Sequence, residues 1–451
     1  MRLTIIGGGG FRVPLVYRAL LTQTATGDAR CTEVTLHDTD PLRARVIASV
    51  LARQAEEAAE AGLPDPPAVR VAGDLDDALR GTDFVFSALR AGGTAGRVGD
   101  ERAPLAEGVL GQETVGAGGV LYGLRTIPAA LRLADRVLAV APEAWVVNFT
   151  NPAGMVTEAM ATRLGHRVIG ICDSPVGLVR RAARAAGAEP DEVGFSYVGL
   201  NHLGWLLTLT HKGRDLLPGL LADDAALASF EEGRLFGARW LRALGALPNE
   251  YLHYYYFARE TRAAALAADR TRGEFLHRQQ SAFFAEAARD PAGAPALWER
   301  IRREREETYG AEARAAGGDE RPRDAEDLEG GGYERVALAL MGAIAGDRRT
   351  RLILNVRNNG TVPELPGHAI VETVCDVDGL GAHPVPTVTP GLAETGLMLQ
   401  VKAVERATIE AAVTGSRAAA LRALALHPLV DSVDAAARVL DRAGALPQPP
   451  A

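Results

Sequence analysis

The sequence has 451 residues, a length typical of two domains, and 47% of its residues are hydrophobic while 24% are charged. Its formal net charge of −8 argues against nucleic acid or an anionic membrane as the main partner, because such partners select basic surfaces. No leader precedes the first strand, no apolar run approaches the ~20 residues that cross a bilayer, and the 3 cysteines are scattered. We therefore expect a cytoplasmic protein without membrane or nucleic-acid partners.

The first half of the chain alternates short apolar strands with helices. This order predicts an α/β fold, a Rossmann-like, doubly wound parallel sheet with helices on both faces, and we expect it to occupy residues 1–195. Ligands of such sheets bind beyond the carboxyl ends of the strands. The expected strands are 2–6, 33–37, 69–71, 83–89, 145–149 and 168–172, and the expected helices are 13–21, 41–61 and 127–141.

The second half, residues 196–451, predicts an α+β, mostly helical domain. Its charged and glycine-rich segment at 316–332 predicts a mobile loop, which is either a lid or a solvated linker. The expected strands are 195–200, 203–210, 352–356 and 369–374, and the expected helices are 224–244, 261–288, 296–315, 333–345 and a C-terminal helical region that ends near 445.

A run of four glycines, 7–10, connects the first strand to the first helix. Bare backbone at this place can approach a pyrophosphate at a helix N-terminus, and Asp38 ends the second strand, where a carboxylate binds ribose hydroxyls and favours NAD over NADP. Arg12 stands where the third glycine of G-x-G-x-x-G is usual, so a turn that serves only close packing stays an alternative. The candidate cofactor-binding residues are Gly7, Gly8, Gly9, Gly10, Phe11, Arg12, Asp38 and Asn148.

Cys172 and His202 are candidate metal ligands. Cys172 ends a strand beside Asp173, and His202 follows Asn201 in a polar break between two strands. One thiolate and one imidazole leave coordination positions open, which suits a metal that also binds substrate oxygens. A cysteine that serves only as a small buried side chain is the alternative.

Three further features are candidates for substrate chemistry. The aromatic run at 251–257 is either a packed wall or, through Tyr251 near a metal, the source of a base. Asn151, in the loop after the strand at 145–149, can bind a sugar or begin a helix. Arg97, in a glycine-rich loop, can bind an anionic group bidentately or remain solvated.

The motifs, taken together and in chain order, resemble glycoside hydrolase family 4 over essentially the whole length. They are IIGGGGFRVP, GVLGQETVGAGG, LRTIP, NFTNPAGMVTEA, GICDSP, GLNHLGW, YLHYYYF and NVRNNG. The overall pattern is most similar to the 6-phospho-β-glucosidases of that family. The resemblance implies hydrolysis of a phosphorylated disaccharide or glucoside with NAD and Mn²⁺ or another divalent metal, and it implies a homodimer or homotetramer.

The resemblance also implies roles for individual residues. Cys172 and His202 match the metal ligands, and Tyr251 matches the catalytic base. In the mechanism that it implies, NAD⁺ removes hydride from C3 of the sugar, the base removes the C2 proton, the glycosidic bond breaks by elimination, and water adds back. Residues 196–451 would then bind substrate and metal and form the oligomer. The matching substrate-binding residues are Arg97, Asn151 and Arg272.

Some observations keep other interpretations open. Asp173 resembles the proposed acid of 6-phospho-α-glucosidases, whereas NFTNPAGMVTEA and YLHYYYF favour the β-enzymes. Gly10, Phe11 and Arg12 replace the family's usual serines and tyrosine, so either Arg12 binds the sugar phosphate or the substrate is not phosphorylated. An NAD-dependent hydroxy-acid dehydrogenase and a non-catalytic NAD-binding protein are the alternatives outside the family.

Overall fold

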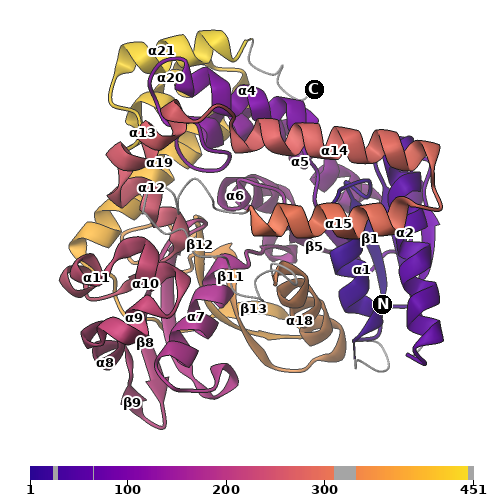
Figure 1. Cartoon of the computed structure of the whole chain (residues 1–451), viewed down its shortest axis with the longest axis horizontal. Coiled ribbons are helices and arrows are strands. Elements are labelled where there is room, and N and C mark those ends of the chain that lie inside the picture. Colours follow the sequence, from indigo (N-terminus) through magenta and orange to yellow (C-terminus); the bar gives the residue numbers. More distant parts are fainter. Residues whose placement is uncertain (24–28, 64, 309–331, 445–451) are drawn as a thin grey trace.

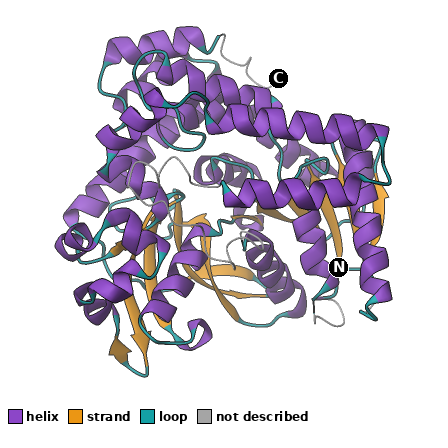
Figure 2. Ribbon diagram, viewed as in Figure 1, coloured by secondary structure: helices purple, strands orange, loops and turns teal. Residues whose placement is uncertain are grey.

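The computed structural model describes residues 1–23, 29–63, 65–308 and 332–444. Helices surround one central sheet (Figures 1 and 2). The strands are β1 (Arg2–Ile6), β2 (Glu33–His37), β3 (Ala68–Val71), β4 (Phe84–Ser87), β5 (Trp145–Asn148), β6 (Val168–Gly170), β7 (Gly194–Leu200), β8 (Leu203–His211), β9 (Arg214–Asp215), β10 (Leu247–Pro248), β11 (Thr350–Arg357), β12 (Ile370–Asp378) and β13 (Gly381–Pro384).

These strands form a 13-stranded sheet in the order β10-β8-β7-β12-β11-β6-β5-β4-β1-β2-β3, with β13 beside β12 and β9 beside β8. The pairings from β3 to β6 are parallel, as the alternation of strands and helices predicts. From β6 onward all pairings are antiparallel, and Asn355 pairs with Gly170 where the two halves of the sheet meet. The Rossmann-like parallel sheet is thus confirmed, and the second half of the chain extends it.

Helices cover both faces of the sheet, and α19 to α21 lie together at one end of the molecule (Figure 1). Their bounds are α1 (Val13–Leu21), α2 (Pro41–Glu60), α3 (Leu75–Leu79), α4 (Gly93–Leu105), α5 (Gly116–Val140), α6 (Ala153–Leu164), α7 (Ser174–Ala185), α8 (Leu217–Ala222), α9 (Asp224–Ala228), α10 (Glu231–Phe236), α11 (Ala238–Leu244), α12 (His253–Tyr256), α13 (Ala258–Ala267), α14 (Arg272–Arg289), α15 (Ala294–Glu307), α18 (Tyr333–Gly346), α19 (Leu392–Thr414), α20 (Arg417–Leu426) and α21 (Val433–Arg442).

Helices from the second half return to complete the N-terminal core. α14 and α15 run side by side across the N-terminal half (Figure 1), and α18 packs against α1. Phe283, Trp298 and Tyr333 from these helices belong to the same buried cluster as Ile5 of β1. The indole of Trp298 donates a hydrogen bond of 2.8 Å to the carbonyl of Phe11, directly after the glycine turn. The turn is therefore held from both halves of the chain.

Several predicted helix bounds are wrong. The helix expected at 224–244 is three short helices, because Gly237 adopts φ +74° and ends the second of them. The helix expected at 261–288 is two, because Thr271 caps a new helix with Glu274. α5 begins at Gly116, earlier than the expected 127–141.

Other expectations meet the limits of the described chain. The expected helix 296–315 is described to Glu307, and residues 316–331 of the expected loop lie outside the described ranges. Within those ranges, no helix has the length and apolar character needed to cross a membrane.

Candidate active site

A cavity of about 1030 Å³ lies beyond the carboxyl ends of the parallel strands. This is where open α/β sheets bind their ligands. Most of the residues singled out in the sequence line it, although they come from both halves of the chain. They are Gly7, Gly10, Phe11, Arg12, Asp38, Arg97, Asn151, Cys172, Asp173, His202, Tyr251 and Arg272.

The glycine turn forms one end of the cavity. Gly7 has φ +83°, and a Cβ at this position would lie 2.5 Å from the carbonyl oxygen of Ala88, so only glycine fits. The N–H of Gly9 donates to the Asp38 carboxylate at 2.9 Å, which ties the turn to the end of β2. Gly8 and Gly9 pack against β2 and the start of α2, behind the lining. The bare backbone fits the pyrophosphate of a dinucleotide, with Asp38 at the ribose end.

Asn148 lies beneath the cavity. Its side chain is fully buried, donates to the Thr150 carbonyl and the Thr157 hydroxyl, and accepts from the Thr150 N–H at 3.1 Å. These contacts shape the loop that presents Asn151 to the cavity. Among the residues that line the cavity Asn148 is absent, so the geometry does not support the expected contact with a cofactor.

His202 and Tyr251 stack face to face, with ring centroids 3.7 Å apart and an angle of 3° between the planes. His202 lies in the turn between β7 and β8, and Nδ1 of its ring is 2.9 Å from the Thr114 hydroxyl. Burial lowers the pKa of His202 to about 3, although Glu113 opposes this shift. A neutral imidazole with its Nδ1 engaged presents Nε2, which is the arrangement that a metal ligand needs.

Acidic groups gather around Cys172. Burial raises the pKa of the Cys172 thiol well above its usual range, and the charges of Glu372 and Asp173 raise it further. Burial also raises the pKa of Asp173 to about 6, although Arg12, whose guanidinium is 4.0 Å away, opposes the shift. A divalent cation would offset these negative charges and stabilise the thiolate.

The donor set fits an open metal site. In the described part of the chain, no group of three or more His, Cys, Asp and Glu side chains is placed to hold a metal. A metal held by Cys172 and His202 would have its remaining coordination positions open to substrate oxygens and water, as a catalytic site requires.

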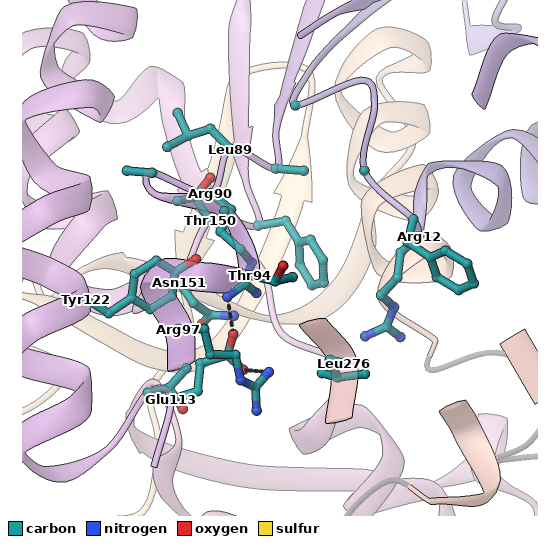
Figure 3. A pocket seen from close by; sticks show the side chains of 18 of the residues that line it. Arg12, Leu89, Arg90, Thr94, Arg97, Glu113, Tyr122, Thr150, Asn151 and Leu276 are labelled. Carbon is teal, nitrogen blue, oxygen red and sulfur yellow. Dashed lines mark ion pairs between the residues drawn. The ribbon is translucent and has the colours of Figure 1, made fainter. Parts of the chain in front are cut away.

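Glu113 connects two arginines at the opposite side of the cavity from Arg12 (Figure 3). Its carboxylate is 2.5 Å from the guanidinium of Arg90 and 2.6 Å from that of Arg97, and Arg97 also bonds Glu101 at 2.7 Å. Burial opposes ionisation of Glu113, but the two positive charges outweigh it and hold the pKa at about 2. Sequence reasoning assigned no role to Glu113, although it lies within GVLGQETVGAGG.

Replacing Glu113 with glutamine is expected to destabilise the fold by roughly 2–3 kcal/mol at pH 7, because the buried Arg97 and the more exposed Arg90 lose their shared partner. The lowered pKa means that the carboxylate stabilises the fold fully above the unfolded-state pKa of ~4.3 and loses this effect as the pH falls toward 2. Urea unfolding at pH 7 and pH 3 should show a smaller difference between wild type and E113Q at pH 3. An equal difference at both pH values would contradict the assignment.

A second group of arginines lines the cavity: Arg272 of α14, Arg305 of α15, and Arg12, which directly precedes α1. Arg272 donates to the Thr308 hydroxyl at 2.7 Å and to the Arg305 carbonyl at 2.9 Å. Burial and the positive charges of Arg12, Arg272 and Arg97 lower the pKa of Arg305 to about 9, although Glu306 opposes them. Such a concentration of partly buried positive charge favours binding of a dianionic group.

Arg305 was missed in the sequence because it is one of several arginines on α15, and their spacing does not show which of them faces inward. Thr114 was missed because a single hydroxyl gives no pattern. Both are identified only by the way distant elements meet.

Two family models match the chain, "Family 4 glycosyl hydrolase" over residues 2–188 and "Family 4 glycosyl hydrolase C-terminal domain" over residues 197–430. The chain belongs to glycosyl hydrolase family 4. This membership confirms the resemblance drawn from the motifs.

The relatives include enzymes named for the β-linkage and enzymes named for the α-linkage. The chain is 32% identical to a 6-phospho-beta-glucosidase of Escherichia coli (strain K12), with 80% of this chain and 77% of that protein covered. It is 30% identical to a 6-phospho-alpha-glucosidase of Leptotrichia buccalis, with 97% and 96% covered. The solved 6-phospho-beta glucosidase of Thermotoga maritima with manganese, NAD+ and glucose-6-phosphate has a TM-score of 0.80 at 26% identity, with 98% and 97% covered.

Proposed function

We propose that this family 4 enzyme hydrolyses 6-phospho-β-glucosides with NAD⁺ and Mn²⁺ or another divalent metal. The observation that carries the proposal is the stacked His202–Tyr251 pair, which lines the same cavity as Cys172 and the glycine turn. Relatives with the corresponding names and the NAD- and manganese-containing neighbour support it. In this proposal residues 1–195 carry the dinucleotide, while residues 196–451 supply His202, Tyr251 and two of the arginines.

Each part of the cavity has a distinct task. Cys172 and His202 would hold the metal, and the glycine turn with Asp38 would hold the dinucleotide. When bound, NAD⁺ supplies reversible oxidation at C3 of the sugar, which acidifies the C2 proton, and the metal polarises the neighbouring oxygens. Tyr251 removes the C2 proton, the bond from C1 to the leaving oxygen breaks by elimination, and water adds back. Asn151 orients the sugar from the loop after β5.

The 6-phosphate belongs, in this proposal, with Arg12, Arg272 and Arg305. Arg97 is already paired with Glu101 and Glu113, so it contributes to this group mainly through its charge. Arg12 lies over the ring of Tyr333 at 4.4 Å, which holds its guanidinium at the cavity. It thereby takes the place of the serines that family members usually carry in this turn.

Replacing Arg305 with glutamine is expected to raise KM for the phosphorylated substrate by roughly 10-fold or more, because a charge-assisted contact contributes ~1.5–3 kcal/mol. NAD⁺ affinity should not change, since the glycine turn is untouched. Steady-state kinetics and NAD⁺ titration by fluorescence check both expectations. An unchanged KM would place the phosphate elsewhere.

One observation favours the α-linked substrate as a second candidate. Asp173 is a carboxyl group whose pKa is raised to about 6 by burial, and such a group can donate a proton to a departing aglycone. Identity to the named relatives of the two kinds is similar. The motifs NFTNPAGMVTEA and YLHYYYF support the β-linkage.

The deciding experiment measures p-nitrophenol release from its 6-phospho-β-glucoside, with and without NAD⁺ and Mn²⁺, under reducing conditions. We expect turnover that requires both additions and accumulates no NADH. Cleavage of only the α-linked phosphoglucoside would keep the mechanism and reverse the linkage. Inactivity toward both would refute the proposal.

We also propose that the enzyme acts in the cytoplasm as a homodimer or homotetramer. The three cysteines, all buried and unbridged, support a reducing compartment. Sedimentation velocity of the purified chain would measure the oligomeric state, and a monomer would refute this part.

A further inference from the structure

Glu372 of β12 is a fully buried carboxylate behind the proposed metal site. Three neutral side chains donate to it. Its Oε2 accepts from the Tyr197 hydroxyl at 3.1 Å, while its Oε1 accepts from the amides of Asn201 at 3.3 Å and Asn355 at 2.9 Å. These three donors fix the orientation of the carboxyl group, and they oppose the effect of burial, which raises the pKa of Glu372 to about 7.

The first connection leads to the metal ligand. Asn201 directly precedes His202, whose φ of +62° is uncommon for a residue with a side chain. The hydrogen bond from Asn201 to Glu372 holds the turn between β7 and β8 in this conformation. The hydroxyl of Thr114 fixes the orientation of the His202 imidazole. The position of His202 therefore depends on both partners.

The second connection leads to the base. The Tyr197 hydroxyl lies against Gly204 of β8, and the neighbouring Asn249 accepts at its Oδ1 from the N–H of Tyr251 at 3.0 Å. The N–H of Asn249 donates to the Gly204 carbonyl at 2.8 Å, which ties this short segment to β8. A Cβ on Gly204 would lie 2.3 Å from the Tyr197 hydroxyl, so only a glycine at this position leaves room for the hydroxyl.

We propose that Glu372 is a positioning residue that fixes the relative positions of His202 and Tyr251, through Asn201 on one side and through Tyr197, Gly204 and Asn249 on the other. The inference rests on the proposed function, in which Cys172 and His202 hold a metal and Tyr251 is the base.

The test compares three variants of the full chain by Mn²⁺ titration with electron paramagnetic resonance, by kcat and KM, and by thermal unfolding. Glu372→Gln keeps the shape of the side chain and removes the charge and one acceptor. Tyr197→Phe removes the hydroxyl that donates to Glu372 and contacts Gly204, and it leaves the hydrogen bond from Asn201 to Glu372 intact. Glu158→Gln is the matched control, because Glu158 is also buried but bonds Lys402 at 2.9 Å.

We expect E372Q to weaken Mn²⁺ binding by roughly 10-fold and to lower kcat, as loss of a residue behind a metal ligand usually does. Y197F should lower kcat with unchanged Mn²⁺ affinity, and E158Q should lower only the unfolding temperature. Unchanged Mn²⁺ affinity in E372Q, or equal losses in E372Q and E158Q, would overturn the inference. Should E372Q not fold, unchanged kcat in Y197F would overturn it. Wild-type protein that binds no Mn²⁺ would instead refute the proposed function.

Discussion

Replacing Tyr251 with phenylalanine is expected to lower kcat by ~10²–10⁴-fold, the usual contribution of a general base. The phenyl ring can still stack on His202 at the same 3.7 Å separation, so the metal ligand keeps its neighbour and only the hydroxyl is lost. Binding of Mn²⁺ and NAD⁺ should therefore persist. This separation of binding from turnover distinguishes a catalytic role from a packing role.

The measurement combines p-nitrophenol release with deuterium uptake at C2 of the sugar in D₂O. Both should fail together in Y251F, because the same hydroxyl removes the C2 proton. Tyr255→Phe is the matched control from the same aromatic run, since Tyr255 is not among the residues that line the cavity. Full deuterium uptake in Y251F would assign the base to another residue.

Replacing Cys172 with serine is expected to weaken Mn²⁺ binding by more than ~100-fold and to abolish turnover, an effect beyond the 10–100-fold of an outer-shell change. A serine hydroxyl does not ionise near neutral pH, so the site loses its anionic ligand. Electron paramagnetic resonance of added Mn²⁺ and the hydrolysis assay test this.

Cys375→Ser is the control for that variant, because Cys375 is a fully buried cysteine outside the cavity lining. It should lower stability and leave Mn²⁺ affinity unchanged. NAD⁺ titration adds a second control, since the glycine turn does not involve either cysteine. Equal Mn²⁺ affinity in C172S and wild type would remove Cys172 from the metal site.

Local patterns predict the parts of this enzyme that lie at the ends of strands. The glycine turn, Asp38 and Cys172 follow apolar strands directly, so the periodicity of the parallel sheet brings them to one edge. Helix bounds in the second half were less predictable, because Gly237 and Thr271 end or begin helices within stretches whose composition reads as continuous.

Residues that depend on long-range packing could not be predicted. Arg305 faces the cavity because α15 crosses the N-terminal half, a path that no local signal encodes. Glu372 lies in an apolar strand and gains its partners only when β7, β11 and β12 pair. Asn148 is the opposite case. Its position at a strand end predicted a contact with the cofactor, but its side chain forms hydrogen bonds with Thr157 and Thr150 instead.

The return of α14, α15 and α18 to the N-terminal core has a consequence for synthesis of the chain. Ribosomes add ~5–20 residues per second, so after the last parallel strand has emerged the core waits for roughly ten seconds or more until Trp298 and Tyr333 follow. Throughout that interval the nascent chain exposes an apolar sheet face. Contacts between neighbouring nascent chains then compete with folding, and slower translation of residues 200–330 would favour aggregation over a correctly closed core.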